Sequence, residues 1–338
     1  MTKKSKTTFG IFAESIGLYF SNFDKFLKYM TFPVLGQILG LGIVLVFLYF
    51  FTENMPKFIE KYPNLNDINT LIIFSIIITL PGLAIFCKAF WEYLKAYVAV
   101  NSMLDNMLKS GKVYDFKAHS QVAEKRVFQF IGLWFILGIF GLLAAFPLLW
   151  VIGGIVAVYL VLVFQVFTFE PELSPIGCIK RSFNLIKGHF GSTFVLLILN
   201  GILTCFLIPQ IFVKLSELSG FANWLSGVFL PIANLIPDIN LQDYGLKPIT
   251  SFDISKIIVE SIILQIIIQY TLPQRSILWS LWYKEQSKKG ESNIPQTKKR
   301  NSKRPSEKLM EETNKKYSKK KKIDKNILRR AMEKDDEE

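Results

Sequence analysis

Polar side chains recur at helical spacing in an apolar stretch of the chain, residues 257–279. The stripe consists of Ser261, Gln265, Gln269, Ser276 and Ser280. Pro273 interrupts the backbone here, and Gln165 and Asn200, from two other apolar stretches, are candidate companions. Polar groups at membrane depth face protein or a water-filled cavity. The stripe therefore predicts either one wall of a polar pathway or hydrogen bonds that hold helices together.

Charged candidates lie near the ends of apolar stretches. Those suited to an anion or a lipid headgroup are Lys180, Arg181, Lys187 and Arg275. Arg275 is either an anion site or a side chain that reaches toward the membrane surface. Glu170 and Glu172 flank Pro171 and form an acidic pair. This pair could hold a cation or exchange a proton, or it could complement the positive N-terminus of the next helix.

Residues for catalysis are sparse. The only histidines are His119 and His189, and the sequence has no His-Glu-x-x-His, Cys-x-x-Cys or phosphate-binding glycine loop. The three cysteines are Cys87, Cys178 and Cys205, which suit small apolar positions better than a disulfide framework. The sequence therefore predicts no metal site and no cofactor, and it favours a protein that is not an enzyme.

Six apolar stretches of about 20 residues are each long enough to cross a bilayer. They are residues 30–52, 71–90, 127–146, 148–169, 193–213 and 257–279. No charged residue occurs from Val127 to Phe169, and one helix of that length would be roughly 65 Å long, so Pro147 must mark a turn. Residues 1–283 are only about 13% charged, about half the share of a typical soluble domain, so a soluble globular enzyme is excluded. The prediction is an all-α polytopic membrane protein whose six transmembrane helices form three hairpins.

The first stretch also contains Gly36 and Gly40, which form a Gly-x-x-x-Gly pattern. Small residues at this spacing let two membrane helices approach closely. We expect this pattern to serve helix packing rather than ligand binding.

Lysine and arginine alternate between rich and poor connecting segments along the chain. The rich segments precede residue 30, follow residue 90 and follow residue 169, and the C-terminal segment is also rich. Positively charged segments stay in the cytoplasm. The distribution predicts a multi-pass inner (cytoplasmic) membrane protein with both termini in the cytoplasm.

Two segments on the predicted cytoplasmic side are amphipathic. Residues 9–23 and 174–190 each place aromatic and aliphatic side chains on one helical face, typical of helices that lie in the membrane interface. The second should begin at Ser174-Pro175, an N-cap followed by proline at the first helical position. Each segment leads into an apolar stretch, and the two align well enough to predict an internal repeat.

Residues 174–188, Ser-Pro-Ile-Gly-Cys-Ile-Lys-Arg-Ser-Phe-Asn-Leu-Ile-Lys-Gly, carry a family resemblance. A Ser-Pro opens a short helix, an Arg-Ser follows and a Lys-Gly closes it before the next span. The pattern resembles a bacterial and archaeal six-span superfamily that includes the membrane domain of glycerophosphoryl diester phosphodiesterases. The ending near residues 278–284 is also similar. The resemblance covers about residues 9–285 and implies the fold, but it does not extend to the phosphodiesterase barrel or its activity.

The C-terminal segment 284–338 differs in composition, with 19 Lys/Arg and 11 Asp/Glu in 55 positions. Such a composition predicts a disordered basic cytoplasmic tail. Anionic lipid headgroups are the favoured partner, and RNA or a ribosome is the less favoured one.

Three functions fit these observations. The first is a non-enzymatic scaffold, accessory or envelope-homeostasis factor that works with another membrane protein. The alternative is a transporter or channel-like protein for a small solute or lipid, with a polar path beside the 257–279 stretch. The third is a lipid-modifying enzyme that uses the acidic pair.

Overall fold

The computed structural model describes residues 6–63, 67–113, 115–142, 146–234, 236 and 248–292, and within these ranges it is helical with no strand. The helices are α1 (Thr8–Phe20), α2 (Phe23–Lys61), α3 (Ile68–Ser110), α4 (Phe116–Glu124), α5 (Val127–Leu142), the 3-10 turn η3 (Pro147–Leu149), α6 (Trp150–Leu160), α7 (Val163–Phe169), α8 (Pro175–Ile186), α9 (Phe190–Gly201), the π-helical segment η4 (Ile202–Leu207), α10 (Ile208–Leu218), α11 (Phe221–Ala233), α12 (Ser251–Tyr270) and α13 (Leu272–Ser292).

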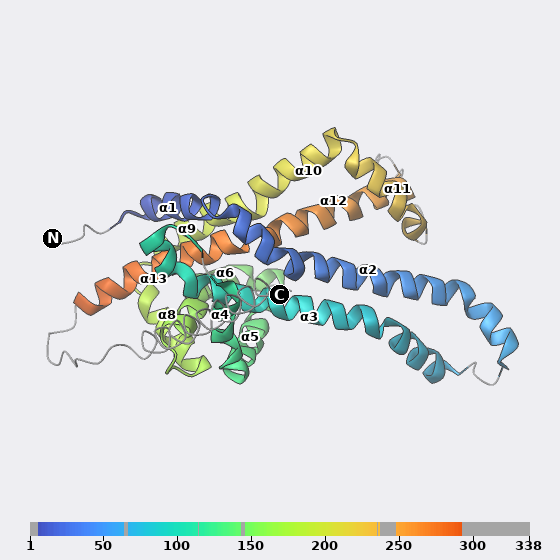
Figure 1. The fold of residues 1–338 in the computed structure, drawn as a ribbon, viewed down its shortest axis with the longest axis horizontal. Helices are drawn as coiled ribbons and strands as arrows, with labels where there is room; N and C mark the ends of the chain where they lie inside the picture. The colour runs from blue at the N-terminus through green and yellow to red at the C-terminus, as the bar shows by residue number, and fades with distance from the viewer. Residues whose placement is uncertain are drawn as a thin grey trace, which may run out of the picture.

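The helices form a body with two projections (Figure 1). The long helices α2 and α3 extend side by side from the body, and α10, α11 and α12 form a second projection above them. At the other end, α1 and the shorter helices α4 to α9 gather around α13. Most fully buried side chains lie in this body, whereas the projections expose many aliphatic and aromatic side chains.

The structure contains four helices that are long and apolar enough to cross a membrane, among the residues described. They are Phe23–Lys61, Ile68–Ser110, Trp150–Phe169 and Phe190–Leu218. A fifth span results if α4 and α5, which meet at a 77° bend, count as one. The chain is therefore a membrane protein by the length and composition of its helices. These helices include the predicted stretches 30–52, 71–90 and 193–213 and all but the first two residues of 148–169, and α5 corresponds to most of 127–146.

The remaining predicted stretch, 257–279, is divided at Thr271 between α12 and α13. Pro273 explains the break, because it has no N–H to donate to the carbonyl of Gln269 and cannot continue a regular helix. The α12 half carries Asp253, Lys256 and Glu260, and α13 is polar overall. Neither half is therefore among the helices that are apolar enough to span a membrane.

The centre of the body is α13, in which every side chain from Leu272 to Gln286 is fully or largely buried. It packs against α1, α3, α7 and α8. The predicted tail began at residue 284, but α13 continues to Ser292, and the side chains from Lys284 to Ser287 are still buried or half-buried against the body. Later residues of the predicted tail lie outside the described part of the chain.

The start of α8 is as predicted. Ser174 is the N-cap, its hydroxyl accepts a hydrogen bond from the Gly177 N–H, and Pro175 is the first helical residue. Proline suits this position because its missing N–H has no helical partner in the first turn.

The packing role predicted for Gly36 and Gly40 is confirmed at the crossing of α2 and α3. A Cβ on Gly40 would lie 2.6 Å from the backbone nitrogen of Phe86, and a Cβ on Gly82 would lie 2.6 Å from the carbonyl oxygen of Gly40. A Cβ on Gly36 would lie 2.8 Å from that of Ala89. The two backbones are in direct contact, so glycine is required at this crossing.

We expect Gly40→Ala to separate α2 from α3 and to lower the free energy of unfolding by about 1–3 kcal/mol, because the methyl group has no space. The matched control is Gly42→Ala on the same helix, where a Cβ meets no atom within 4 Å. Unfolding in mixed detergent, followed by circular dichroism, measures both. Equal stability of the two variants would contradict the close crossing.

Candidate functional site

The residues of the predicted polar stripe do not form one continuous surface in the structure. Ser261 and Gln265 are exposed on α12. Gln269, at the end of α12, is buried and its Oε1 accepts a 3.0 Å hydrogen bond from Gln37 of α2. Ser276 and Ser280 follow the break and enter the body. The break at Thr271 thus separates the stripe into an outer half and an inner half.

The inner half meets a cluster around Asn101 of α3. The Oδ1 of Asn101 accepts hydrogen bonds from Ser276 at 2.5 Å, Ser280 at 2.8 Å and the Gln165 amide at 3.2 Å. Asn101 is fully buried. The structure therefore brings three of the predicted residues together through a fourth that sequence reasoning did not single out.

A cavity of about 340 Å³ lies beside this cluster. It is lined by α3, α5, α9, η4 and α13 and is partly open to the outside. Its lining consists of Tyr93, Leu94, Tyr97, Trp134, Leu197, Asn200, Gly201, Thr204, Cys205, Leu272, Arg275 and Trp279. We call it the Arg275 cavity. Two predicted residues, Asn200 and Arg275, are brought together here, and Gln165 touches its wall through a 3.2 Å hydrogen bond to the Tyr97 hydroxyl.

Three side chains that line this cavity have buried polar atoms without a hydrogen-bond partner in the described structure. These atoms are Nε of Arg275, Oδ1 of Asn200 and Nε1 of Trp134. Asn200 is only 4% exposed. Buried polar atoms are nearly always paired, so unpaired ones on three side chains that line a single cavity make it the candidate ligand site.

Arg275 is hydrogen-bonded to the Tyr93 side chain and to the backbone of α12. Its Nη2 donates a 2.9 Å hydrogen bond to the Ile268 carbonyl, one of those left free where α12 ends. No carboxylate lines the cavity, and Arg275 forms no ion pair with any described residue. A partly buried cation without a counter-charge is unfavourable, and a bound anion would relieve that cost.

One wall of the cavity is locally unwound. The π-helical segment η4 contributes Thr204 and Cys205, and it follows Gly201 of α9. Pro209 explains it, because its missing N–H leaves the Cys205 carbonyl without the usual helical bond and the preceding turn widens. Single π-turns inside helices are often found at functional sites.

The acidic pair is divided by the structure. Glu170 Oε1 accepts hydrogen bonds from Arg181 Nε at 3.0 Å and from the Tyr283 hydroxyl at 2.8 Å. Burial raises the pKa of Tyr283, and the neighbouring Glu170 charge raises it further. Glu172 is exposed. Glu170 therefore joins α8 to α13, and the pair does not form one carboxylate site.

The predicted headgroup contacts differ in availability. Lys180 and Lys187 are exposed on α8, whereas Arg181 is engaged with Glu170. Within the described ranges no group of three or more histidine, cysteine or acidic side chains is placed to hold a metal ion.

Several site residues escaped the sequence analysis. Asn101, Tyr97 and Trp134 lie in long apolar or mixed stretches where nothing in the spacing marks them. The one signal in the sequence was the side-chain amide of Asn101, because an amide that is buried on a helix has to find a hydrogen-bond partner.

Comparisons with known proteins return no match, either among protein-family models, among curated proteins or among solved structures. The resemblance to the six-span superfamily therefore stays a prediction, and the site is interpreted from its geometry alone.

We expect Asn101→Leu to destabilise the body strongly, by about 1–3 kcal/mol for each buried donor left unpaired. The control is Asn184→Leu on the exposed face of α8. Thermal unfolding of the detergent-solubilised protein compares the two. A melting temperature for Asn101→Leu that matches the control would show that the cluster contributes no stability.

Proposed function

We propose that this chain is a multi-pass inner-membrane protein that binds an anion in the Arg275 cavity, as a carrier or transport protein does, rather than an enzyme. The observation that carries the proposal is Arg275 itself. It lies without a counter-charge among the described residues and beside other unpartnered buried polar atoms. An anion that accepts from Arg275 and Trp134 and donates to Asn200 would pair all three.

We place six spans in the membrane, with the sixth running through α12 into the first turns of α13. α12 has 20 residues, about 30 Å of helix, which matches the hydrocarbon thickness. Its charged residues Asp253, Lys256 and Glu260 lie toward one end, and Lys256 pairs with Glu217 and Glu260. This arrangement and the lysine-rich segments favour cytoplasmic termini.

On this topology α1 and α8 lie at the cytoplasmic surface as interfacial helices. α1 exposes Phe9 and Phe20, and α8 exposes Lys180 and Lys187. Aromatic and basic side chains of this kind suit the headgroup region of an anionic membrane.

A scaffold or accessory role does not require the Arg275 cavity. A catalytic role for the acidic pair has less support, because Glu170 is bonded to Arg181 and Tyr283 whereas Glu172 is exposed. Binding of an anion explains the uncompensated arginine, the unpaired atoms and the π-turn together. Among the three functions that the sequence suggests, the transport alternative therefore has the most support.

The test uses the thiol of Cys205, which is exposed and lines the cavity. In a Cys87→Ser background, an anionic methanethiosulfonate reagent should react with Cys205 faster than a cationic one. Arg275→Gln should lower that rate ratio by more than about a hundredfold, because the charge acts with opposite sign on the two reagents. One charge at roughly 10 Å and an effective dielectric constant of about 20 contributes about 1.7 kcal/mol.

Two features of the chain supply controls. Burial raises the pKa of Cys178 to about 11, so this thiol stays protonated and unreactive at neutral pH. Lys187→Gln removes one positive charge from an exposed position on α8. No reaction at Cys205, or a ratio equally sensitive to both charge removals, would refute the proposal.

A further inference from the structure

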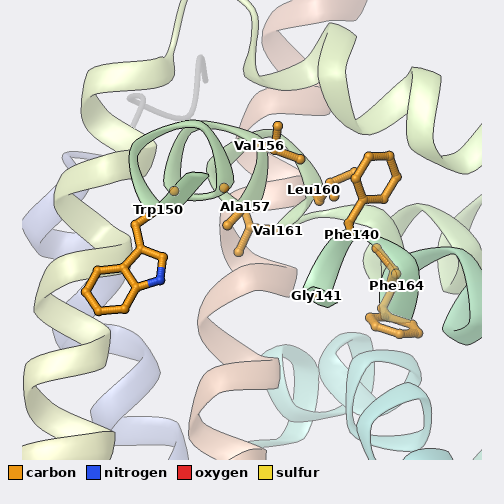
Figure 2. Close-up of a pocket in the computed structure, with 11 residues that line it drawn as sticks. Phe140, Gly141, Trp150, Val156, Ala157, Leu160, Val161 and Phe164 are labelled. Carbon is orange, nitrogen blue, oxygen red and sulfur yellow. The ribbon is translucent and has the colours of Figure 1, made fainter. Parts of the chain in front are cut away.

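A second space lies beside the Arg275 cavity, between α5 and the helices α6 and α7. It is a groove of about 710 Å³, within the usual range of ligand pockets, roughly 300–1,000 Å³. Its lining is apolar and includes Leu137, Phe140, Val161 and Phe164. Figure 2 shows Phe140 and Phe164 on one side and Trp150 on the other. We call it the apolar groove.

Glycines keep this groove open. Gly141, Gly153 and Gly154 line it, and a Cβ on any of the three would meet no atom within 4 Å. Side chains of the described residues therefore do not fill this space, although α6 follows soon after α5 in the sequence.

One aromatic layer separates the groove from the Arg275 cavity. Phe164 lines the groove, and its ring lies 4.6 Å from that of Trp134 and 5.3 Å from that of Tyr97, centroid to centroid. Trp134 and Tyr97 both line the Arg275 cavity. An apolar space and a cationic space are thus adjacent.

We propose that the ligand is an anionic membrane phospholipid, with its phosphate at Arg275 and one acyl chain in the apolar groove. This inference rests on the proposed anion binding and names its substrate class. An acyl chain is the apolar group that the bilayer supplies at this depth, and the charge of Arg275 selects a negative headgroup. A free anion would use the cavity but would leave the groove without an occupant.

A helix from another protein fits the groove less well. A helix about 10 Å across would fill this volume within about 9 Å of its length, fewer than two turns. A single flexible chain, in contrast, can occupy a narrow space and pass the partly exposed ring of Phe164.

The experiment measures lipid binding to the full-length protein in detergent by native mass spectrometry. The probes are dioleoylphosphatidylglycerol and dioleoylphosphatidylcholine, which share acyl chains and differ in net charge. We expect phosphatidylglycerol to bind about tenfold more tightly, and Arg275→Gln to remove this preference.

The groove is tested by Gly141→Leu, which fills it, against Gly138→Leu one turn away on α5. Gly138 is exposed, does not line the groove and also has open space at its Cβ. Gly141→Leu should weaken phosphatidylglycerol binding about tenfold, and Gly138→Leu should not. Gly154→Leu repeats the test from the opposite wall should Gly141→Leu fail to fold.

The two proposals fail in different ways. If Gly141→Leu and Gly154→Leu bind lipid like the control, or if glycerol 3-phosphate displaces phosphatidylglycerol completely, the lipid inference is wrong. The Cys205 rate ratio would then still depend on Arg275, and anion binding would stand. If that ratio does not depend on Arg275, the proposed function fails first.

Discussion

The constraint on which the fold depends is the burial of a polar helix. α13 carries glutamine and serine side chains into the centre of the body, where they are buried away from solvent, and its Arg275 and Lys284 are half-buried. Each must find a partner on a neighbouring helix, since an unpaired buried group costs about 1–3 kcal/mol. Asn101 pairs two of the serines, Ser15 of α1 pairs Gln274, and Thr193 of α9 pairs the Trp282 indole. These bonds fix how α1, α3 and α9 surround α13.

The pairing is incomplete at several buried side chains of the described residues, among them Gln274, Gln286 and Ser287 of α13, and three of the side chains concerned line the Arg275 cavity. Arg275, Asn200 and Trp134 come from three different helices, yet their unpaired atoms border one cavity. The same region contains the break between α12 and α13 and the π-turn η4, both produced by prolines. Two interruptions of regular helix thus supply the space and the unpaired groups, whereas the glycine crossing of α2 and α3 keeps another part of the molecule closely packed.

Much of this architecture was predictable from the sequence, because length and hydropathy decide which segments can cross a bilayer. The start of α8 at Ser174 and the role of Gly40 followed from local chemistry that the rest of the chain does not override. The buried extension of α13 was not predictable, since its composition is that of an exposed helix and only its neighbours show it to be central. For the same reason, the residues that flank Asn101 in the sequence do not indicate that its side chain accepts hydrogen bonds from three other helical residues.

The direction of α13 has one further consequence. The helix begins next to the Arg275 cavity and ends at Ser292, beyond which the sequence continues into its lysine-rich segment. About 25 Å of continuous helix joins the two. When the C-terminal segment adheres to a charged surface, the resulting force therefore acts on the same helix that carries Arg275. The position of the C-terminal segment and the geometry of the Arg275 cavity are mechanically coupled through α13.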